Sequence, residues 1–179
     1  MLTAAHCGNY HDPALAGDGP DVIGFQAQTS TKRDSMILRA ADSMQPRVYI
    51  GDPKATYGAE VIGMTKLYFG NYFCTDGAKT GYHCGIQVTY TGMSGYNEHG
   101  WHLQHMAVGT QKDGGCAGAR GDSGGPIVVP TSQFSKKKAG GTISGGIGPH
   151  ADCPYGGQDG RSKVFSHALP MCWPSSMRP

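Results

Sequence analysis

The strip from Ala119 to Pro126, Ala-Arg-Gly-Asp-Ser-Gly-Gly-Pro, constrains the fold of this chain more than any other stretch. Three glycines and a proline within eight residues are too many for a helix interior or a central strand. Such a strip predicts a tight turn whose backbone can point successive N–H groups at one place. A serine in that turn, here Ser123, would hold its hydroxyl beside an anion-binding site, as acyl transfer requires.

Composition favours an all-β domain around this turn. Glycine accounts for 29 of the 179 residues, while only 16% of the residues are charged and 38% are hydrophobic. Short apolar segments recur between Gly-rich turns without an amphipathic-helix pattern, which predicts a β-barrel or sandwich. A short helical loop is expected around His6, and strands are expected at 22–27, 34–40, 60–65, 71–75, 82–91, 101–108, 125–129, 141–146 and 162–167.

Charge and hydropathy limit the partners that the chain can have. The formal net charge is +2, from 15 Lys and Arg against 13 Asp and Glu, which gives no case for nucleic-acid or membrane-surface binding. No apolar run approaches the roughly 18 residues of a transmembrane helix. We therefore expect neither a nucleic-acid nor a membrane partner.

Two further stretches bear on function, Leu-Thr-Ala-Ala-His-Cys at 2–7 and Asp-Ser-Met-Ile-Leu-Arg at 34–39. Together with the Gly-Asp-Ser-Gly-Gly-Pro motif at 121–126 they resemble the trypsin/chymotrypsin family, in its chain order His, Asp, Ser. The segment 72–85 adds a resemblance to secreted bacterial members of the streptogrisin and α-lytic protease type. The resemblance extends from Met1 to about Leu169.

The resemblance implies two orthogonal antiparallel β-barrels with the active site between them. It divides the chain into 1–45, a remnant of the amino-terminal barrel; 46–59, the crossing; 60–169, the carboxy-terminal barrel; and 170–179, a tail. In the family several strands precede the histidine motif, so we expect an incomplete first barrel, a loosely held His6 and poor activity. No signal peptide precedes this motif, which predicts a fragment or a misplaced start.

The resemblance also implies a serine endopeptidase that acts through an acyl-enzyme, needs no cofactor or metal and works as a monomer on protein or peptide substrates. The alternatives on the same fold are a pseudo-protease binding module and an inactive truncated fragment. Family motifs place the catalytic triad at His6, Asp34 and Ser123, the oxyanion hole at the N–H groups of Gly121 and Ser123, and substrate binding at Ser144, Gly145 and Gly146.

The primary specificity pocket is less constrained by the sequence. The family places the pocket floor at Gly114, and this glycine with Gly146 predicts an open pocket that takes apolar or aromatic side chains. Asp113 is one position away, and a slip of one residue would make it a floor carboxylate that selects Lys or Arg. Both preferences stay open from the sequence.

Six cysteines without metal-type spacing suggest an oxidising, extracellular setting. The resemblance implies the pairs Cys74–Cys84 and Cys116–Cys153, and it leaves Cys7 and Cys172 either free or paired with each other. It also leaves Asp122 without a partner, because Thr75 stands where bacterial members often carry an arginine. A buried unpaired carboxylate would be costly.

Several other features have simpler explanations. Alternation along a strand puts His102 opposite His99 and His105, which disfavours a metal site. Lys136–Lys138 is expected to be a solvated loop, and the Arg-Gly-Asp tripeptide at 120–122 belongs to the serine motif rather than to cell adhesion. Asp12, Asp18 and Asp21 compete with Asp34 for the triad, but none of them precedes an apolar strand.

Overall fold

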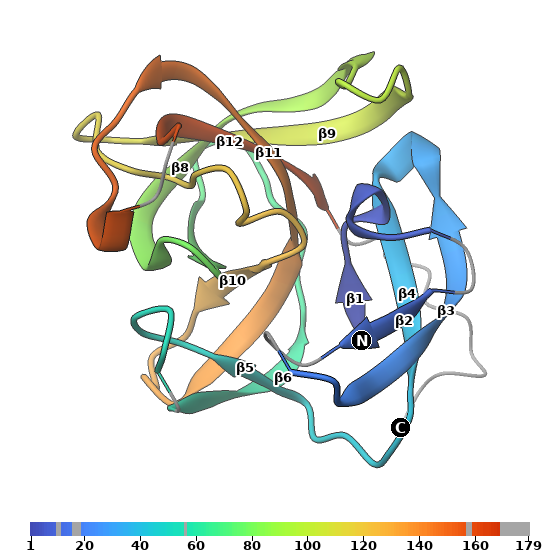
Figure 1. Cartoon of the computed structure of the whole chain (residues 1–179). Helices are drawn as coiled ribbons and strands as arrows, with labels where there is room; N and C mark the ends of the chain where they lie inside the picture. Colours follow the sequence, from blue (N-terminus) through green and yellow to red (C-terminus); the bar gives the residue numbers. More distant parts are fainter. Residues whose placement is uncertain (10–11, 16–18, 56, 157–158, 169–179) are drawn as a thin grey trace.

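The structure is a computed structural model that describes residues 1–9, 12–15, 19–55, 57–156 and 159–168. It contains two β-sheet units, antiparallel except where β6 pairs with β11, and three short 3-10 turns (Figure 1). In chain order the elements are β1 (Leu2–Thr3), η1 (Ala5–Cys7), β2 (Pro13–Leu15), β3 (Val22–Ser30), η2 (Thr31–Arg33), β4 (Ser35–Ala40), β5 (Arg47–Tyr49), β6 (Gly58–Met64), β7 (Tyr72–Gly77), β8 (Gly81–Tyr96), β9 (His102–Gln111), β10 (Pro126–Pro130), β11 (Lys136–His150), η3 (Pro154–Gly156) and β12 (Arg161–Ala168).

The amino-terminal unit is a four-stranded sheet in the order β1-β4-β3-β2. Alternation along β4 turns Met36 and Leu38 inward, where they pack with Ala5 of η1. Within the described residues β1 and β2 remain edge strands, and between them lies a cavity of about 420 Å³ lined by residues such as Met1, Ala14 and Leu38. This sheet is therefore open, as the sequence predicts for the first barrel.

The carboxy-terminal unit is a closed barrel of six strands. Its order is β10-β7-β8-β9-β12-β11, and the pairing of β10 with β11 closes the ring, while β6 and β5 continue from β11. Closure removes the exposed edges that an open sheet would present. The core is a single apolar cluster of Leu67, Phe73, Ile86, Val88, Ala107, Ala117, Ile127, Ile143 and Val164.

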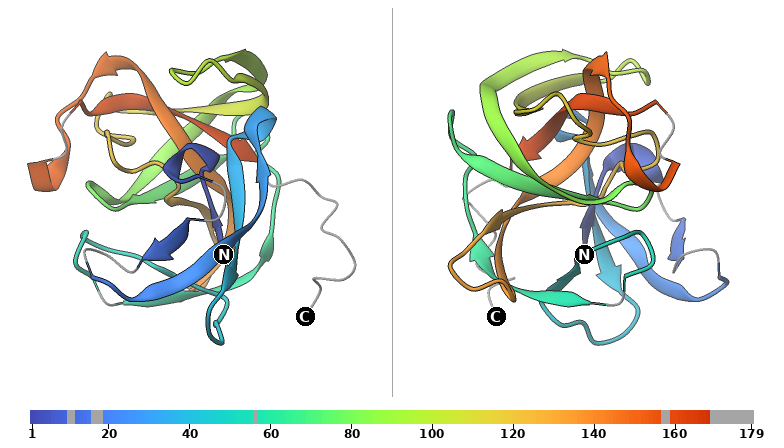
Figure 2. Two further views of the ribbon diagram at one scale, coloured as in Figure 1. Left: turned by 45° about the vertical axis from the view of Figure 1, so that its right-hand side comes forward. Right: turned by 90° about the vertical axis from the view of Figure 1, so that its left-hand side faces the viewer.

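The amino-terminal sheet lies beside the barrel in Figure 1, with β1 on the side toward the barrel, and the right-hand view of Figure 2 looks from the barrel side. The turn η2 packs against β9 of the barrel. Among the described residues no helix has the length and apolar character needed to cross a membrane. The all-β prediction is confirmed.

Both predicted disulfides are present. Cys74–Cys84 joins β7 to β8, and Cys116–Cys153 joins the segment before the serine motif to the segment before η3. Among the described residues Cys7 is exposed and forms no disulfide, while Cys172, its other possible partner, and the predicted tail at 170–179 lie outside the described residues.

The prediction of a solvated loop at Lys136–Lys138 is wrong. These residues begin β11, where Lys137 pairs with Val61 of β6 and with Pro130 of β10. The side chain of Lys137 is 2% exposed, its ammonium donates a hydrogen bond to the carbonyl oxygen of Phe134, and it lies 4.7 Å from the centre of the Phe134 ring. The methylene stem of a lysine can be buried against apolar surface when its ammonium has a hydrogen-bond acceptor. Three consecutive lysines in a sequence do not show which of them is buried in this way.

Two short strands were also absent from the prediction. β2 lies in a segment expected to be a loop, and β5 lies inside the expected crossing at 46–59, where it pairs with β6. Each has only three residues, which is too short for alternation to show in the sequence.

The close packing of β9 on the barrel core gives a test of the fold. A Cβ atom on Gly109 would lie 2.2 Å from Cζ of Phe73 and 2.7 Å from Cγ2 of Ile86, so we expect Gly109→Ala to lower the free energy of unfolding by about 1–3 kcal/mol through overpacking. Gly95→Ala in β8 is the matched control, because a Cβ there meets no atom within 4 Å. Denaturant titration of both variants measures the difference. Equal stabilities would contradict this packing.

Candidate active site

His6 and Asp34 form a hydrogen-bonded pair at the inner side of the amino-terminal sheet. Nδ1 of His6 lies 2.8 Å from Oδ2 of Asp34, and the backbone N–H of His6 donates to Oδ1 at 3.1 Å. Two contacts to one carboxylate fix both the position of η1 and the plane of the imidazole. Asp12 and Asp21 are exposed, whereas Asp34 is fully buried, so among the described carboxylates Asp34 is the partner of His6.

Asp34 is also held by the barrel. The hydroxyl of Ser144 in β11 donates a hydrogen bond to Oδ2 of Asp34, and the guanidinium of Arg33 donates to Nε2 of His167 in β12 at 3.1 Å. Asp34 itself has φ 43° and ψ 51°, a left-handed conformation that a short polar side chain tolerates better than most. The carboxylate therefore connects the two sheets.

The histidine segment docks directly on the serine motif. Gly124 has φ +81°, and a Cβ there would lie 2.1 Å from Oγ1 of Thr3 and 3.0 Å from the backbone nitrogen of Ala4. On the other side of His6, Sγ of Cys7 lies 3.5 Å from the carbonyl oxygen of Ser123. Only a glycine at 124 allows this approach, which sets η1 beside Ser123.

These residues surround a cleft of about 450 Å³ between the sheets. His6 lies on one side of it and the loop from Ala119 to Ser123 on another, while Asp34 sits behind His6. The predicted substrate strand at 144–146 forms a further wall. The structure thus gathers at one cleft the predicted residues His6, Gly121, Ser123 and 144–146, with Asp34 as the buried partner of His6.

Electrostatics of the pair follow from these contacts. The hydrogen bond to Asp34 raises the pKa of His6 above its ordinary value of 6.5, since it outweighs the effect of burial, and the charges of Asp34 and Glu98 act in the same direction. Burial alone would raise the pKa of Asp34, but hydrogen bonds from His6 and Ser144 hold that pKa below its ordinary value. The pair is built to carry a proton on His6 next to an ionised carboxylate.

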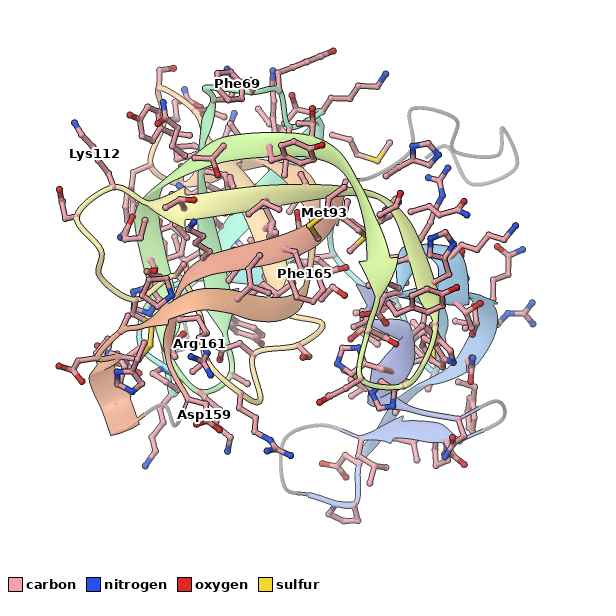
Figure 3. All side chains as sticks on the ribbon, turned by 90° about the horizontal axis from the view of Figure 1, so that it is seen from above. Phe69, Met93, Lys112, Asp159, Arg161 and Phe165 are labelled. Atoms are coloured by element: carbon pink, nitrogen blue, oxygen red, sulfur yellow. A yellow bond between two sulfur atoms is a disulfide. The ribbon has the colours of Figure 1, made fainter. Side chains whose placement is uncertain are left out.

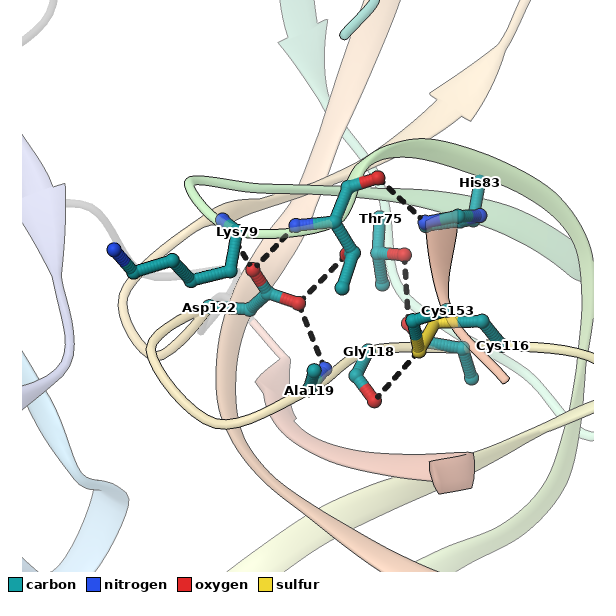
Figure 4. The surroundings of a disulfide bond; sticks show 10 residues. Thr75, Lys79, His83, Cys116, Gly118, Ala119, Asp122 and Cys153 are labelled. Carbon is teal, nitrogen blue, oxygen red and sulfur yellow. Dashed lines mark hydrogen bonds between the residues drawn. A yellow bond between two sulfur atoms is a disulfide. The ribbon is translucent and has the colours of Figure 1, made fainter. Parts of the chain in front are cut away.

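Asp122 has a complete set of hydrogen-bond partners (Figure 4). Its Oδ1 accepts from the backbone N–H groups of Lys79 and Thr80 at 2.8 and 3.1 Å, and its Oδ2 accepts from the Thr80 hydroxyl and from the N–H of Ala119, each at 2.7 Å. The expectation that Asp122 lacks a partner is therefore wrong. The turn after β7 supplies neutral donors, and the side chain of Asp122, only 1% exposed, is unavailable to an adhesion partner.

Two neighbours complete this region behind the loop. Thr75, at the position where bacterial members often carry an arginine, is buried and its hydroxyl donates a hydrogen bond to the carbonyl oxygen of Ala117 at 2.9 Å. Burial and the nearby charge of Asp122 raise the pKa of Asp76 to about 7. The serine loop is thus anchored on β7 through hydrogen bonds rather than through an ion pair.

The loop also presents backbone donors to the cleft. Gly121 has φ +92°, and within the described residues the N–H groups of Gly121 and Ser123 donate no hydrogen bond to another part of the chain. Both residues line the cleft. Two unpaired N–H groups beside a serine hydroxyl can donate hydrogen bonds to a ligand oxygen on which negative charge develops.

The turn between β8 and β9 covers His6, a contact that the sequence analysis missed. The ring of His99 stacks on that of His6 with centroids 5.4 Å apart, and His99 in turn contacts Trp101 at 5.5 Å. Oδ1 of Asn97 holds the turn by accepting from the N–H groups of His99 and Trp101.

In the described part of the chain no cluster of His, Cys, Asp or Glu has the geometry to hold a metal ion.

Neither predicted floor residue reaches the cleft. Asp113 and Gly114 are both exposed in the turn after β9, and among the described residues the cleft is lined instead by Arg120, Asp159, Arg161 and Phe165. Among the described residues, Asp113 therefore does not line this cleft as a floor carboxylate. Sequence could not reveal Arg161 and Phe165, because strand pairing across the barrel places them there.

Comparison with known proteins gives no match to a family model and none to a curated protein. Solved structures do match. Cellulomonas bogoriensis chymotrypsin is 25% identical with a TM-score of 0.66, over 93% of this chain and 77% of that chain. Thermobifida fusca protease A is 26% identical with a TM-score of 0.67, over 93% and 76%. Nocardiopsis protease is 23% identical with a TM-score of 0.67, over 94% and 77%.

The chain has the fold of the bacterial chymotrypsin-like serine proteases. This similarity supports a protease that hydrolyses proteins or peptides. The chymotrypsin-like double-barrel architecture expected from the resemblance is confirmed. Among the described residues the first of the two sheets is open.

The His6–Asp34 pair yields a prediction that needs no activity assay. In Asp34→Asn the carboxylate is lost, so we expect the pKa of His6 to fall, because the hydrogen bond to Asp34 is the largest contribution that raises it. NMR titration of the histidine ring resonances measures this pKa. Asp21→Asn, an exposed carboxyl in the same sheet region, is the control and should leave His6 unchanged. An unaltered His6 titration in Asp34→Asn would refute the pairing.

Proposed function

We propose that this chain is a serine endopeptidase that hydrolyses peptide bonds through a triad of Ser123, His6 and Asp34. The observation that carries the proposal is the docking of the His6–Asp34 pair onto the serine loop. Thr3 and Ala4 abut Gly124, and Cys7 contacts Ser123, so the imidazole and the hydroxyl line one cleft. The likeness to serine proteases of known structure supports the same reaction.

In the first half of the reaction, Oγ of Ser123 attacks the substrate carbonyl carbon while Nε2 of His6 takes the hydroxyl proton. The imidazolium that forms is stabilised by Asp34, which also fixes the tautomer through Nδ1. The N–H groups of Gly121 and Ser123 donate to the oxyanion of the tetrahedral intermediate. Its collapse breaks the C–N bond, and His6 returns the proton to the leaving amine.

In the second half, water attacks the acyl-enzyme ester while His6 again accepts a proton. The second tetrahedral intermediate collapses with release of the carboxylic acid product, and His6 returns the proton to Oγ of Ser123. The barrel donors and the paired imidazole are in place before substrate binds, so little reorganisation opposes the reaction. The protein groups named here suffice for every proton transfer.

Substrate backbone is proposed to bind along Ser144–Gly146 of β11. These residues pair with β12 on one side and line the cleft on the other, and the two glycines give an extended chain close access. We further propose an extracellular monomer, with residues 1–45 and 60–169 as its two units around the crossing at 46–59. Two disulfides and the bacterial protease neighbours support the extracellular setting.

The nucleophile assignment is tested with Ser123→Ala. We expect turnover on a peptide substrate to fall by about 10⁶-fold, the loss caused by removal of the nucleophile in subtilisin, and covalent labelling by a fluorophosphonate to disappear. Ser94→Ala, an exposed serine of β8, should keep both. Labelling that persists in a folded Ser123→Ala variant would overturn the assignment, and a folded wild-type chain without labelling or turnover would indicate a binding module.

The pH dependence of the reaction follows from the raised pKa of His6. Below that pKa the imidazole is protonated and cannot take the serine proton, so kcat/KM should fall as pH decreases through a midpoint above 6.5. A pH profile of kcat/KM from 4.5 to 9 measures this midpoint. His102→Gln, which alters an exposed histidine of β9, should leave the profile unchanged. A midpoint below 6.5 would contradict the role of Asp34 as a hydrogen-bond acceptor from His6.

A further inference from the structure

Arg161 connects two walls of the cleft. Its backbone N–H donates to the carbonyl oxygen of Gly118 at 2.9 Å, and its own carbonyl oxygen accepts from the N–H of Ala117 at 2.8 Å. These bonds fasten the start of β12 to the segment that leads into the serine loop. The side chain of Arg161 then crosses toward β11, which carries the opposite wall.

The side chain fills space that a glycine leaves vacant. A Cβ on Gly146 would lie 2.8 Å from Cγ and 3.1 Å from Cβ of Arg161, so the arginine stem lies directly against this glycine. Beyond the stem, Nη1 reaches the carbonyl oxygen of Gly148 at 3.4 Å, a long and weak contact. Figure 3 shows Arg161 at the start of β12, near Asp159, with Phe165 further along the strand.

The guanidinium has no carboxylate partner within the described residues. Glu98 and Asp159 line the same cleft, but neither comes within 4.0 Å of a nitrogen of Arg161 or of Arg120, which is the second cation of the lining. Glu98 instead faces His99 and His6, and its side chain is 83% exposed. Hydrogen-bonding capacity of Arg161 therefore remains available to a ligand.

An apolar ligand side chain fits this wall poorly. It would cover a guanidinium whose one hydrogen bond in the described chain is the weak contact to Gly148, and burying unpaired donors is costly. The aromatic ring of Phe165 packs against Gly145 of β11, since a Cβ on Gly145 would lie 2.6 Å from its Cζ. A carboxylate, by contrast, can accept two parallel hydrogen bonds from one guanidinium.

We propose that Arg161 is a specificity-determining residue that selects substrates with a glutamate or aspartate immediately before the scissile bond. The inference rests on the proposed protease function. The attacked carbonyl must lie at Ser123, so the side chain of that substrate residue enters between the serine loop and the strand at Ser144–Gly146. Arg161 is bonded to the first of these walls and lies against the second.

The test is a set of peptides that differ only at this position, with Glu, Gln, Asp, Asn, Leu, Phe and Lys. A charge-assisted hydrogen bond predicts that wild-type kcat/KM for Glu exceeds that for isosteric Gln by roughly tenfold to a hundredfold. Arg161→Gln should bring the Glu/Gln ratio to about one, with the Gln peptide little affected, whereas Arg161→Lys should keep the ratio above one.

Lys163→Gln is the matched control. Lys163 is two residues along the same face of β12, and its stem lies over Gly148 rather than in the lining of the cleft. It should leave the Glu/Gln ratio as in the wild type. The rate of labelling by an uncharged fluorophosphonate shows whether each variant retains a working Ser123.

The outcomes separate the two proposals. A wild-type preference for Leu, Phe, Lys or Gln over Glu would overturn the role of Arg161 even if every variant failed to fold. A Glu preference that survives Arg161→Gln in a variant that still labels would also overturn it and would point to Arg120. A folded chain that cleaves no peptide and takes no label would overturn the proposed function, and the specificity with it.

Discussion

The buried carboxylate of Asp34 is the interaction on which the site depends. It accepts hydrogen bonds from the backbone and ring of His6 and from the hydroxyl of Ser144, so three groups from two sheets converge on one side chain. A buried charge is stable only when its lone pairs are satisfied, and here the donors are the groups that must be positioned. The orientation of the imidazole and the relative position of the two sheets are therefore coupled through Asp34.

Much of this arrangement could be predicted from the sequence. Alternation and glycine-rich turns located nearly all the longer strands, and three short motifs located His6, Asp34 and Ser123. The sequence could not show that Thr80 would satisfy Asp122, because that contact joins a turn after β7 to a loop 42 residues away. It also could not show Lys137 as a buried strand residue or Arg161 in the cleft, since both follow from pairing between distant strands.

The open first sheet contrasts with the closed barrel. Its edge strands and the apolar residues along β3, Val22, Ile23 and Phe25, remain exposed in the described part of the chain. His6 nevertheless has defined contacts, because Asp34 and the ring of His99 contact it directly and Gly124 packs against Thr3 and Ala4, which precede it. His99 and Gly124 both belong to the barrel unit, so order at His6 depends in part on the docking of the two units.

The hydrogen bonds of Asp122 have a consequence for how such an enzyme becomes competent. A carboxylate that required a charged group released by cleavage would leave the serine loop unformed until that cleavage. Here the four donors belong to Lys79, Thr80 and Ala119, which lie in the same unit as the serine itself. The serine loop can therefore take its shape as that unit folds, without a charged group supplied by cleavage elsewhere in the chain.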